Sequence, residues 1–287
     1  MKTAFICSRT NYSFAKCQAL RHFPSSRHSA YLNIGKYSSI ISSSIEIELI
    51  LIPELRIVRC YMNTTAILSY LSDLEQHNEK GWYHTHRLQY QEADTAFIEL
   101  LSKLIWEIGK TDTSIIHNDP HDLTFKLVRD TRFSHDKSPY NPCFRAHISS
   151  AGKLPVPVGY YIKIQPGNRS FLGGGLFADM FQDATSKVRD YIAAHGAEWQ
   201  KIMDEDCFSE AFRVKGTCLK NVPRGYDSTH PQSEYLKNKS WYLEYPVSDD
   251  QLQQDSFIAF AADIFQRMQP FNAFLNNALS GFVMPGR

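Results

Sequence analysis

The sequence lacks closely spaced cysteine pairs, and this absence excludes two kinds of site. Its six cysteines are scattered over 287 residues, and none forms a C-x-x-C pair. Zinc knuckles and redox dithiols need such pairs. Reduced and mostly buried thiols are therefore expected, in a compartment as reducing as the cytosol.

Long apolar runs and a strongly basic surface are also missing. No stretch approaches the eighteen or so apolar residues that a membrane-spanning helix needs. Residues 62–287 hold 23 basic and 27 acidic residues, a net charge of −4. Proteins that bind nucleic acid instead present a dense basic face. We therefore expect neither a membrane nor a nucleic acid as a partner.

Acidic residues are absent from positions 1–45, which contain ten serines and six Lys/Arg. That composition suits an organelle transit peptide. It also suits an extension translated from the wrong start, because Met62 opens the first well-patterned helix. We predict that residues 1–61 form a disordered leader outside a folded domain at 62–287, with one short strand within 45–57. The protein is then expected in the cytoplasm, or in mitochondria or another organelle if the leader is a transit peptide.

Hydrophobic periodicity predicts a domain of helices and strands. The hydrophobic content of 43% and the charged content of 21% are typical of globular proteins. Apolar residues recur at helical spacing in three long stretches, 64–76, 88–108 and 256–279. Short aromatic and β-branched segments indicate an antiparallel meander, namely 123–128, 144–148, 158–164, 169–172 and 241–247. The expected fold class is α+β, with a central, mainly antiparallel sheet flanked by helices in a single domain.

The stretch from Phe125 to His147 carries the densest charge, with five charged residues in nine: Arg129, Asp130, Arg132, Asp136 and Lys137. The planar guanidinium of arginine binds two oxygens of a carboxylate or phosphate at once. Three cations against two acids leave one positive charge uncompensated. These cations are therefore candidate anion ligands, unless arginine–aspartate pairs simply hold the loop together.

The triplet Gly173-Gly174-Gly175 follows a predicted strand and precedes a helix that Asp179 is expected to cap and that ends at His195. Backbone amides at a helix N-terminus attract anions, and glycines let a ligand approach the main chain. No Gly-Lys-Ser/Thr follows, so the triplet is not a Walker phosphate loop. The alternative is a strand bent where another backbone crosses closely.

Trp82, His84 and His86 lie in the motif WYHTH at an expected helix start. Residues two apart on a helix point about 200° away from each other. The two histidines therefore could not share a metal ion, and no third ligand with a suitable spacing is nearby. No metal or cofactor is expected. If the protein is an enzyme, His86 and Asp136 are the candidate proton-transfer groups, while Trp82 and Tyr140 are candidate ligand contacts.

Four blocks of the sequence resemble one known family. They are NEKGWYHTHRLQY (78–90), RDTRFSHDKSPY (129–140), GYYIKIQPG (159–167) with FLGGGL (171–176), and PRGYDSTHPQSEYLKNKS (223–240). Together they are similar to the patterns of domain-of-unknown-function family 2461, over about residues 62–279. The resemblance implies a single α+β domain with a leader outside it, and it implies no activity. The chain departs from the family at Asn141-Pro142, where members usually have Lys-Thr, so a site that uses that lysine would be weakened here.

Two functions are compatible with these patterns. In the first, a small anionic ligand is bound, or turned over, by the cations of the charged stretch with the glycine amides behind it: Arg129, Arg132, Lys137 and Gly173–Gly175. The cations and the triplet should then converge in one concave pocket. In the second, the protein is a non-catalytic interaction module, in which the charges order the loop. An aromatic surface then meets a protein partner of unspecified identity: Trp82, Tyr140 and Tyr160.

Overall fold

The computed structural model describes residues 47–52, 55–60, 63–132 and 134–285. Strands β1 (Ile47–Ile52) and β2 (Leu55–Cys60) pair antiparallel as a hairpin. The sequence predicted one strand in this region, and the structure has two. Most of the predicted leader, residues 1–46, lies outside the described residues, so its disorder and its targeting role stay predictions.

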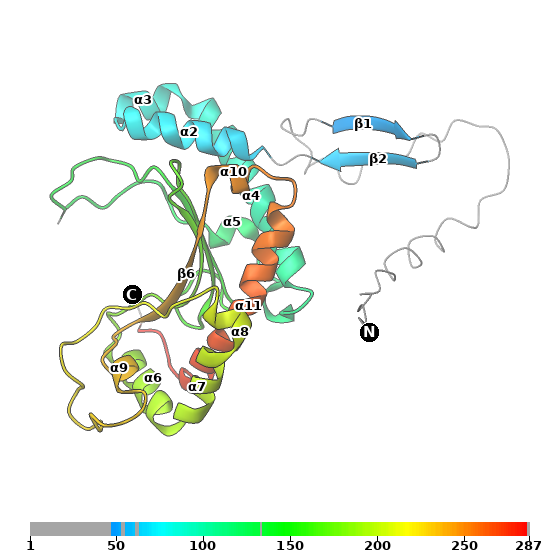
Figure 1. Cartoon of the computed structure of the whole chain (residues 1–287). Helices are drawn as coiled ribbons and strands as arrows, with labels where there is room; N and C mark the ends of the chain where they lie inside the picture. The colour runs from blue at the N-terminus through cyan, green and yellow to red at the C-terminus, as the bar shows by residue number, and fades with distance from the viewer. Residues whose placement is uncertain (1–46, 53–54, 61–62, 133, 286–287) are drawn as a thin grey trace, which may run out of the picture. The chain divides into compact units, whose positions relative to one another are not determined.

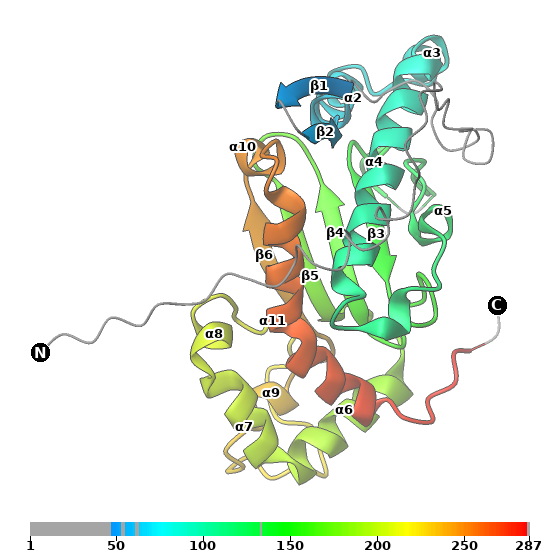
Figure 2. The same ribbon diagram turned by 90° about the vertical axis from the view of Figure 1, so that its right-hand side faces the viewer.

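The three long helices that periodicity predicted are present: α2 (Thr64–Gln76), α4 (Arg87–Ile108) and α11 (Phe257–Ala278). Asn63 begins α2, and its side chain accepts a hydrogen bond from the backbone N–H of Ala66 at 3.0 Å. Helix α2 packs against α4, and α4 packs against α11. Figure 2 shows α4 and α11 side by side over the sheet.

The central sheet contains four strands: β3 (Phe144–Ile148), β4 (Gly159–Ile164), β5 (Ser170–Leu176) and β6 (Trp241–Val247). Their order in space is β3-β4-β5-β6, and each neighbouring pair is antiparallel. The predicted fold class, α+β with an antiparallel sheet and flanking helices, is therefore confirmed (Figure 1).

The two faces of the sheet differ in what they carry, because successive residues of a strand point to opposite faces. One face is buried against α4 and α11, and its residues belong to the core: Phe144, Ala146, Ile148, Tyr160, Ile162, Leu172 and Leu243. The other face, called here the open face, carries partly buried residues: Arg145, Tyr161, Lys163, Phe171, Tyr242 and Glu244. Within the described part of the chain, no helix lies against the middle of the open face (Figure 1).

Two predicted strands differ from the observed ones. The segment 123–128 is no continuous strand, because Leu123 ends the short helix α5 (Pro120–Leu123) and only Thr124 and Val128 form isolated bridges, to Ala146 and Tyr140. The strand predicted to end at Leu172 continues through the glycine triplet to Leu176.

The crossing from β5 to β6 contains α6 (Gln182–Ala194), α7 (Gly196–Asp204), α8 (Asp206–Ser209) and α9 (Ser233–Leu236). The prediction that Asp179 caps α6 is wrong. Helix α6 begins after Phe181 and has no side-chain cap. Its first turn is held by tertiary contacts instead, since the Thr185 hydroxyl donates to the backbone carbonyl of Lys239 at 3.0 Å.

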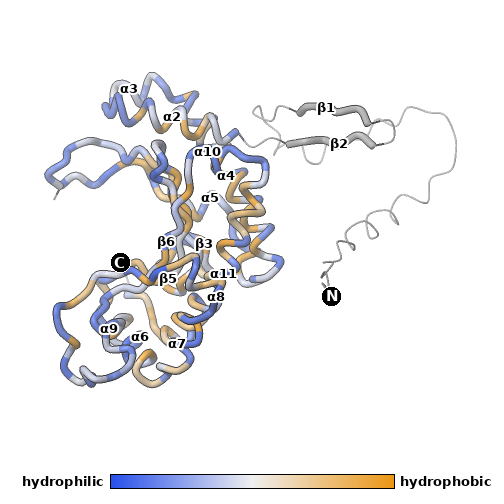
Figure 3. The backbone as a smooth tube through the Cα atoms, viewed as in Figure 1, coloured by the Kyte–Doolittle hydropathy of each residue, from blue (hydrophilic) through white to orange (hydrophobic). Residues whose placement is uncertain are grey.

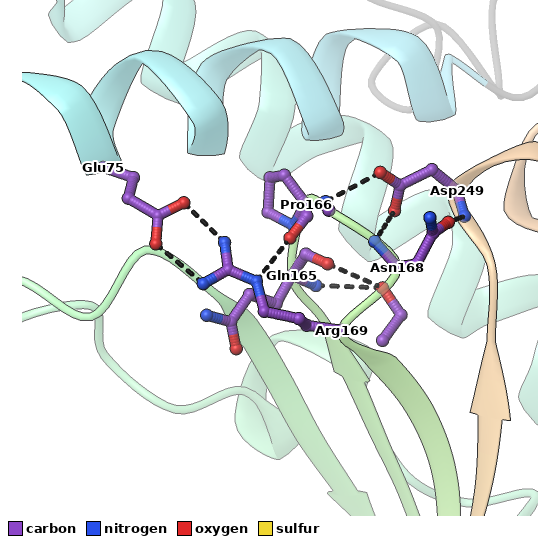
Figure 4. A network of polar contacts seen from close by, with 8 residues as sticks. Glu75, Gln165, Pro166, Asn168, Arg169 and Asp249 are labelled. Carbon is purple, nitrogen blue, oxygen red and sulfur yellow. Dashed lines mark hydrogen bonds and ion pairs between the residues drawn. The ribbon is translucent and has the colours of Figure 1, made fainter.

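The turn between β4 and β5 is fixed to two other elements, as Figure 4 shows. Arg169 forms a two-point ion pair with Glu75 of α2, with one N–O distance of 2.9 Å. Asp249, the first residue of α10 (Asp249–Leu252), accepts from the backbone N–H of Gly167 at 2.7 Å. In the reverse direction, the Asn168 side chain accepts a hydrogen bond from the backbone N–H of Asp249 at 2.9 Å. These contacts hold one end of the sheet in place.

Candidate functional site

Residues 129–139, called here the arm, project from the edge of the sheet next to β3. The arm begins at the antiparallel bridge between Val128 and Tyr140, and the backbone N–H of Arg129 donates to the carbonyl of Pro139 at 2.9 Å. Figure 3 shows that the arm is hydrophilic over most of its length. It contains the five charged residues of the dense stretch: Arg129, Asp130, Arg132, Asp136 and Lys137.

The arginines of the arm pair with its aspartates. The Arg129 guanidinium contacts the Asp136 carboxylate, and Arg132 Nη2 lies 2.6 Å from Asp130 Oδ2. Hydrogen bonds from Ser138, together with Arg129, hold the pKa of Asp136 well below its usual range. A proton-transfer group works best with a pKa near the operating pH. The role predicted for Asp136 therefore stays a prediction, and this low pKa argues against it.

Lys137 carries the fifth charge of the arm, the positive charge that the aspartates do not balance. Its Nζ donates to the backbone carbonyl of Thr131 at 2.9 Å. Each cation of the arm thus has a partner within the arm itself. This geometry is the one expected if the charges order the loop, and the ligand role of Arg129, Arg132 and Lys137 stays a prediction.

The first two sequence blocks meet at the base of the arm. The Asn78 side chain donates to the carbonyl of Tyr140 at 3.0 Å and accepts from its backbone N–H at 3.1 Å. The Tyr83 ring stacks on the Tyr140 ring, with centroids 4.5 Å apart, and Arg87 donates to the Tyr83 hydroxyl at 3.0 Å. The motif before α4 therefore holds the arm where it leaves the sheet.

Replacing Asn78 with alanine is expected to loosen the arm. The change leaves two backbone groups of Tyr140 without their partners, at a cost of roughly 1 kcal/mol each. We expect a loss of about 1–2 kcal/mol in the free energy of unfolding and faster amide hydrogen exchange at Arg129. Asn277→Ala, an exposed change on α11, is the matched control: it should leave the exchange at Arg129 unchanged and should not lower the free energy of unfolding, because alanine is the better helix former. Unchanged exchange at Arg129 in the Asn78 variant would contradict the holding role.

His86 and Trp82 lie together beside this base. His86 lies between the end of α3 (Lys80–Thr85) and the start of α4. Its ring stacks on Trp82 at 4.1 Å between centroids, and its Nδ1 lies 2.8 Å from the Trp82 carbonyl oxygen. Nearby, the Tyr70 hydroxyl is buried without a hydrogen-bond partner, and burial raises its pKa. The structure thus brings Trp82, His86 and Tyr140 into one region, while their roles stay predictions.

The glycine triplet lies elsewhere, in the middle of β5, with β4 and β3 between it and the arm. It precedes no helix directly, so its amides belong to the sheet and not to a helix N-terminus. A β-carbon on Gly174 would lie 3.0 Å from Met268 Sδ of α11, and one on Gly173 would lie 3.0 Å from Leu243 O. Side chains of α11 thus lie close to Gly174, and the backbone of β6 lies close to Gly173.

Sequence reasoning missed two cations on the open face. Arg145 of β3 and Lys163 of β4 lie directly opposite each other in the strand register. The ion pairs among the described residues include neither of them, and Arg145 Nε is buried without a partner. The alternation in FRAHI and GYYIKI was the available signal, because it places both cations opposite the apolar face.

Aromatic rings surround these two cations. The Arg145 guanidinium lies 5.6 Å from the centroid of Phe125, and Lys163 Nζ lies 5.6 Å from that of Phe171. The Tyr161 ring lies near both of these rings, 6.3 Å from Phe125 and 5.7 Å from Phe171 between centroids. Burial raises the pKa of the neighbouring Cys143 thiol, and both cations oppose that rise together with Arg169. The open face therefore combines positive charge with flat apolar surface.

Comparison with known proteins identifies a family for this chain but no activity. A model for a family of conserved hypothetical proteins, DUF2461, matches residues 66–274. No curated protein and no solved structure gives a match. Among the described residues, no group of His, Cys, Asp and Glu could hold a metal ion, and no helix is long and apolar enough to cross a membrane.

Proposed function

Since the chain belongs to the DUF2461 family of conserved hypothetical proteins, whose description names no activity, we propose from the geometry that it binds a small anionic ligand on the open face of its sheet. The family match covers all four sequence blocks, and the third block forms strands β4 and β5 beneath this face.

One observation carries the proposal. Arg145 and Lys163 are neighbouring cations with no carboxylate partner among the described residues. A half-buried arginine without an acidic partner is costly to desolvate, and an anionic ligand offsets that cost. In the arm an anion has to displace Asp136 or Asp130 from an arginine, and only Lys137, which donates to a backbone carbonyl, has no carboxylate partner among the described residues.

The surroundings favour one kind of anion. Tyr161, Phe171 and Phe125 offer ring faces beside the two cations. A ligand with a flat ring gains stacking contacts there, while its carboxylate or phosphate receives charge-assisted hydrogen bonds from Arg145 and Lys163. We therefore expect an aromatic carboxylate or phosphate ester to bind more tightly than inorganic phosphate.

The test is a thermal-shift titration of the full chain with phenyl phosphate, benzoate and inorganic phosphate. Phenyl phosphate should raise the melting temperature by mass action. Lys163→Gln removes one charge-assisted contact, so it should weaken binding at least about tenfold. Lys187→Gln removes the same charge from helix α6, which belongs to the connection between β5 and β6 and not to the open face. It should leave the shift in melting temperature unchanged.

A second variant distinguishes ligand binding on the open face from ligand binding at the arm. Arg132→Ala removes a cation that the sequence singled out, and the open-face proposal expects it to leave the phenyl phosphate shift unchanged. A loss of binding in Arg132→Ala with normal binding in Lys163→Gln would assign the ligand to the arm and contradict the open-face location. The absence of a shift with any of the three anions would contradict anion binding altogether.

A further inference from the structure

A groove lies between helices α7 and α11, which pack against each other (Figure 2). Its volume is about 830 Å³, and it is lined by α7 with the residue that follows it and by the C-terminal half of α11. None of the lining residues belongs to a strand of the central sheet. The groove therefore shares no residue with the proposed anion site on the open face.

The floor of the groove is apolar, and its α11 wall is low. The buried side chains of Ile202 from α7 and Phe274 from α11 form the floor. Along α11, Pro270, Ala273 and Asn277 are exposed and follow one another at a spacing of three and four residues, so they lie on one face of the helix. The small side chain of Ala273 in the middle of this row leaves room above the floor.

The rim of the groove is negatively charged. Three exposed acids line it, Glu198, Asp204 and Glu205, against a single base, Lys201, which leaves a net charge of −2. Among the described residues, none of the three carboxylates forms an ion pair with a lysine or an arginine. Glu198 has only a histidine nearby, with His195 Nδ1 at 3.9 Å from its carboxylate.

Two of these acids stand where a helix disfavours them. Helix α7 ends at Asp204, and Glu205 follows directly. The C-terminus of a helix carries a partial negative charge, which favours cations and disfavours carboxylates there. Lys201 in the last turn offsets part of this charge, and the hydrogen-bond donor to Asp204, Gln200 Nε2 at 2.8 Å, is neutral. A positively charged group from a partner would therefore relieve the repulsion at this end of α7.

The spacing of the acids matches the repeat of a second helix. Glu198 and Glu205 are seven residues apart, about 10 Å along the axis of α7, with Ile202 between them. On a partner helix, residues i and i+7 lie about as far apart on one face, and residues i+3 and i+4 lie between them. Lysines at i and i+7 with leucines at i+3 and i+4 would thus meet the two acids and the apolar floor together. Two such lysines also balance the net charge of the groove.

We propose that the groove between α7 and α11 binds an amphipathic basic helix of a partner protein. Its apolar side chains pack over Ile202 and Phe274, and its basic side chains pair with Glu198 and Glu205. An amphipathic helix that lays its apolar face into a groove is a common form of peptide recognition. Nothing in this proposal depends on the open face, so the two sites can be tested and can fail independently.

The first experiment measures the binding of a labelled peptide to the full chain by fluorescence anisotropy. The probe is an alanine-based peptide of about fifteen residues, long enough to form a helix, with lysines at i and i+7 and leucines at i+3 and i+4. Saturable binding is expected, and it should weaken as the salt concentration rises. Two control peptides, with glutamate in place of the lysines or serine in place of the leucines, should not bind. No saturable binding of the probe, or equal binding of either control, would overturn the proposal.

A pair of tryptophan variants tests the location. Ala273→Trp fills the groove without changing its charge, so it should weaken binding of the probe at least about tenfold. Ala197 is also exposed, on α7, but does not line the groove. Ala197→Trp should therefore bind the probe as the parent does. Unchanged binding in Ala273→Trp would overturn the proposal.

A charge variant and a second measurement control for folding. Exposed ion pairs contribute up to about 1 kcal/mol, so Glu205→Gln should weaken binding of the probe about two- to fivefold. Glu79→Gln removes an exposed acid before α3, outside the groove, and should not change it. If Ala273→Trp does not fold, the backbone amide resonances of Ile202 and Ala273 in the parent decide the matter. They should shift when the probe is added, and unchanged signals would overturn the proposal.

Sedimentation distinguishes a partner helix from a second copy of this chain. The parent and Ala273→Trp are expected to have the same oligomeric state, because the proposed occupant belongs to another protein. A parent oligomer that dissociates in Ala273→Trp would show that a second copy fills the groove, and it would overturn the proposal.

Discussion

Replacing Gly175 with alanine is expected to lower the free energy of unfolding by about 3 kcal/mol or more. Gly175 has a φ of +95°, in the region that side-chain-bearing residues rarely adopt, and this alone costs roughly 1–2 kcal/mol. A β-carbon there would also lie 2.4 Å from Trp241 O and 2.7 Å from the Phe271 ring. Overpacking of this kind adds typically about 1–3 kcal/mol. Chemical denaturation of parent and variant measures the loss.

Gly81 supplies the matched control. It lies in α3, and a β-carbon on it would meet nothing within 4 Å. Alanine is the better helix former by about 1 kcal/mol, so Gly81→Ala should stabilise the protein slightly. A Gly175→Ala variant as stable as the parent would show that the backbone of β5 can move away from Trp241. The structural explanation of this glycine would then be wrong.

Acidification from pH 6.5 toward pH 4 is expected to destabilise the protein through His147. This histidine of β3 is 5% exposed, and burial lowers its pKa to about 4, although the nearby carbonyls of Leu154 and Lys153 oppose the shift. The unfolded chain takes up this proton below about pH 6.5, whereas the folded state takes it up only below about pH 4. The stability that this group contributes is therefore complete above pH 6.5 and is lost progressively as the pH falls toward 4, by about 3 kcal/mol in total.

Denaturation midpoints at several pH values between 4 and 7 measure this loss in the parent. In His147→Asn the slope over this range should become shallower, whatever the absolute stability of the variant. His135→Asn, which removes an exposed histidine from the arm, should keep the slope of the parent. An equal slope in parent and His147→Asn would show that other groups cause the pH dependence.

The sequence predicted the elements whose patterns are long and regular. Helix α2 and strand β6 have the predicted bounds, α4 begins one residue earlier than predicted, and α11 is one residue shorter than predicted at each end. The strand predicted at 169–172 stopped before the end of β5, because glycine has a low strand propensity. Close packing against α11 overrides that propensity here. The cap of α6 was misplaced because tertiary bonds, which a local pattern does not contain, hold its first turn.

The candidate site was predicted in part. Sequence reasoning located the arm and its neighbours Trp82 and His86, since dense charge and aromatic motifs are visible in a linear chain. It left open whether the guanidinium groups bind a ligand or pair with the aspartates of the loop, because the direction of a long side chain depends on contacts such as that between Arg129 and Asp136. The opposed pair Arg145 and Lys163 needed the register of two strands, which only the folded sheet defines.

The connectivity of the sheet has a kinetic consequence. Strands β3, β4 and β5 follow one another closely, so they can pair through short loops, whereas β6 joins β5 only after the chain has closed the loop of residues 177–240. Loop closure costs entropy before the new contacts form, and such distant pairings form slowly. We therefore expect β6 to dock late in folding. Until then the glycine-rich edge of β5 stays unpaired, which makes this strand the place where two nascent chains would associate wrongly.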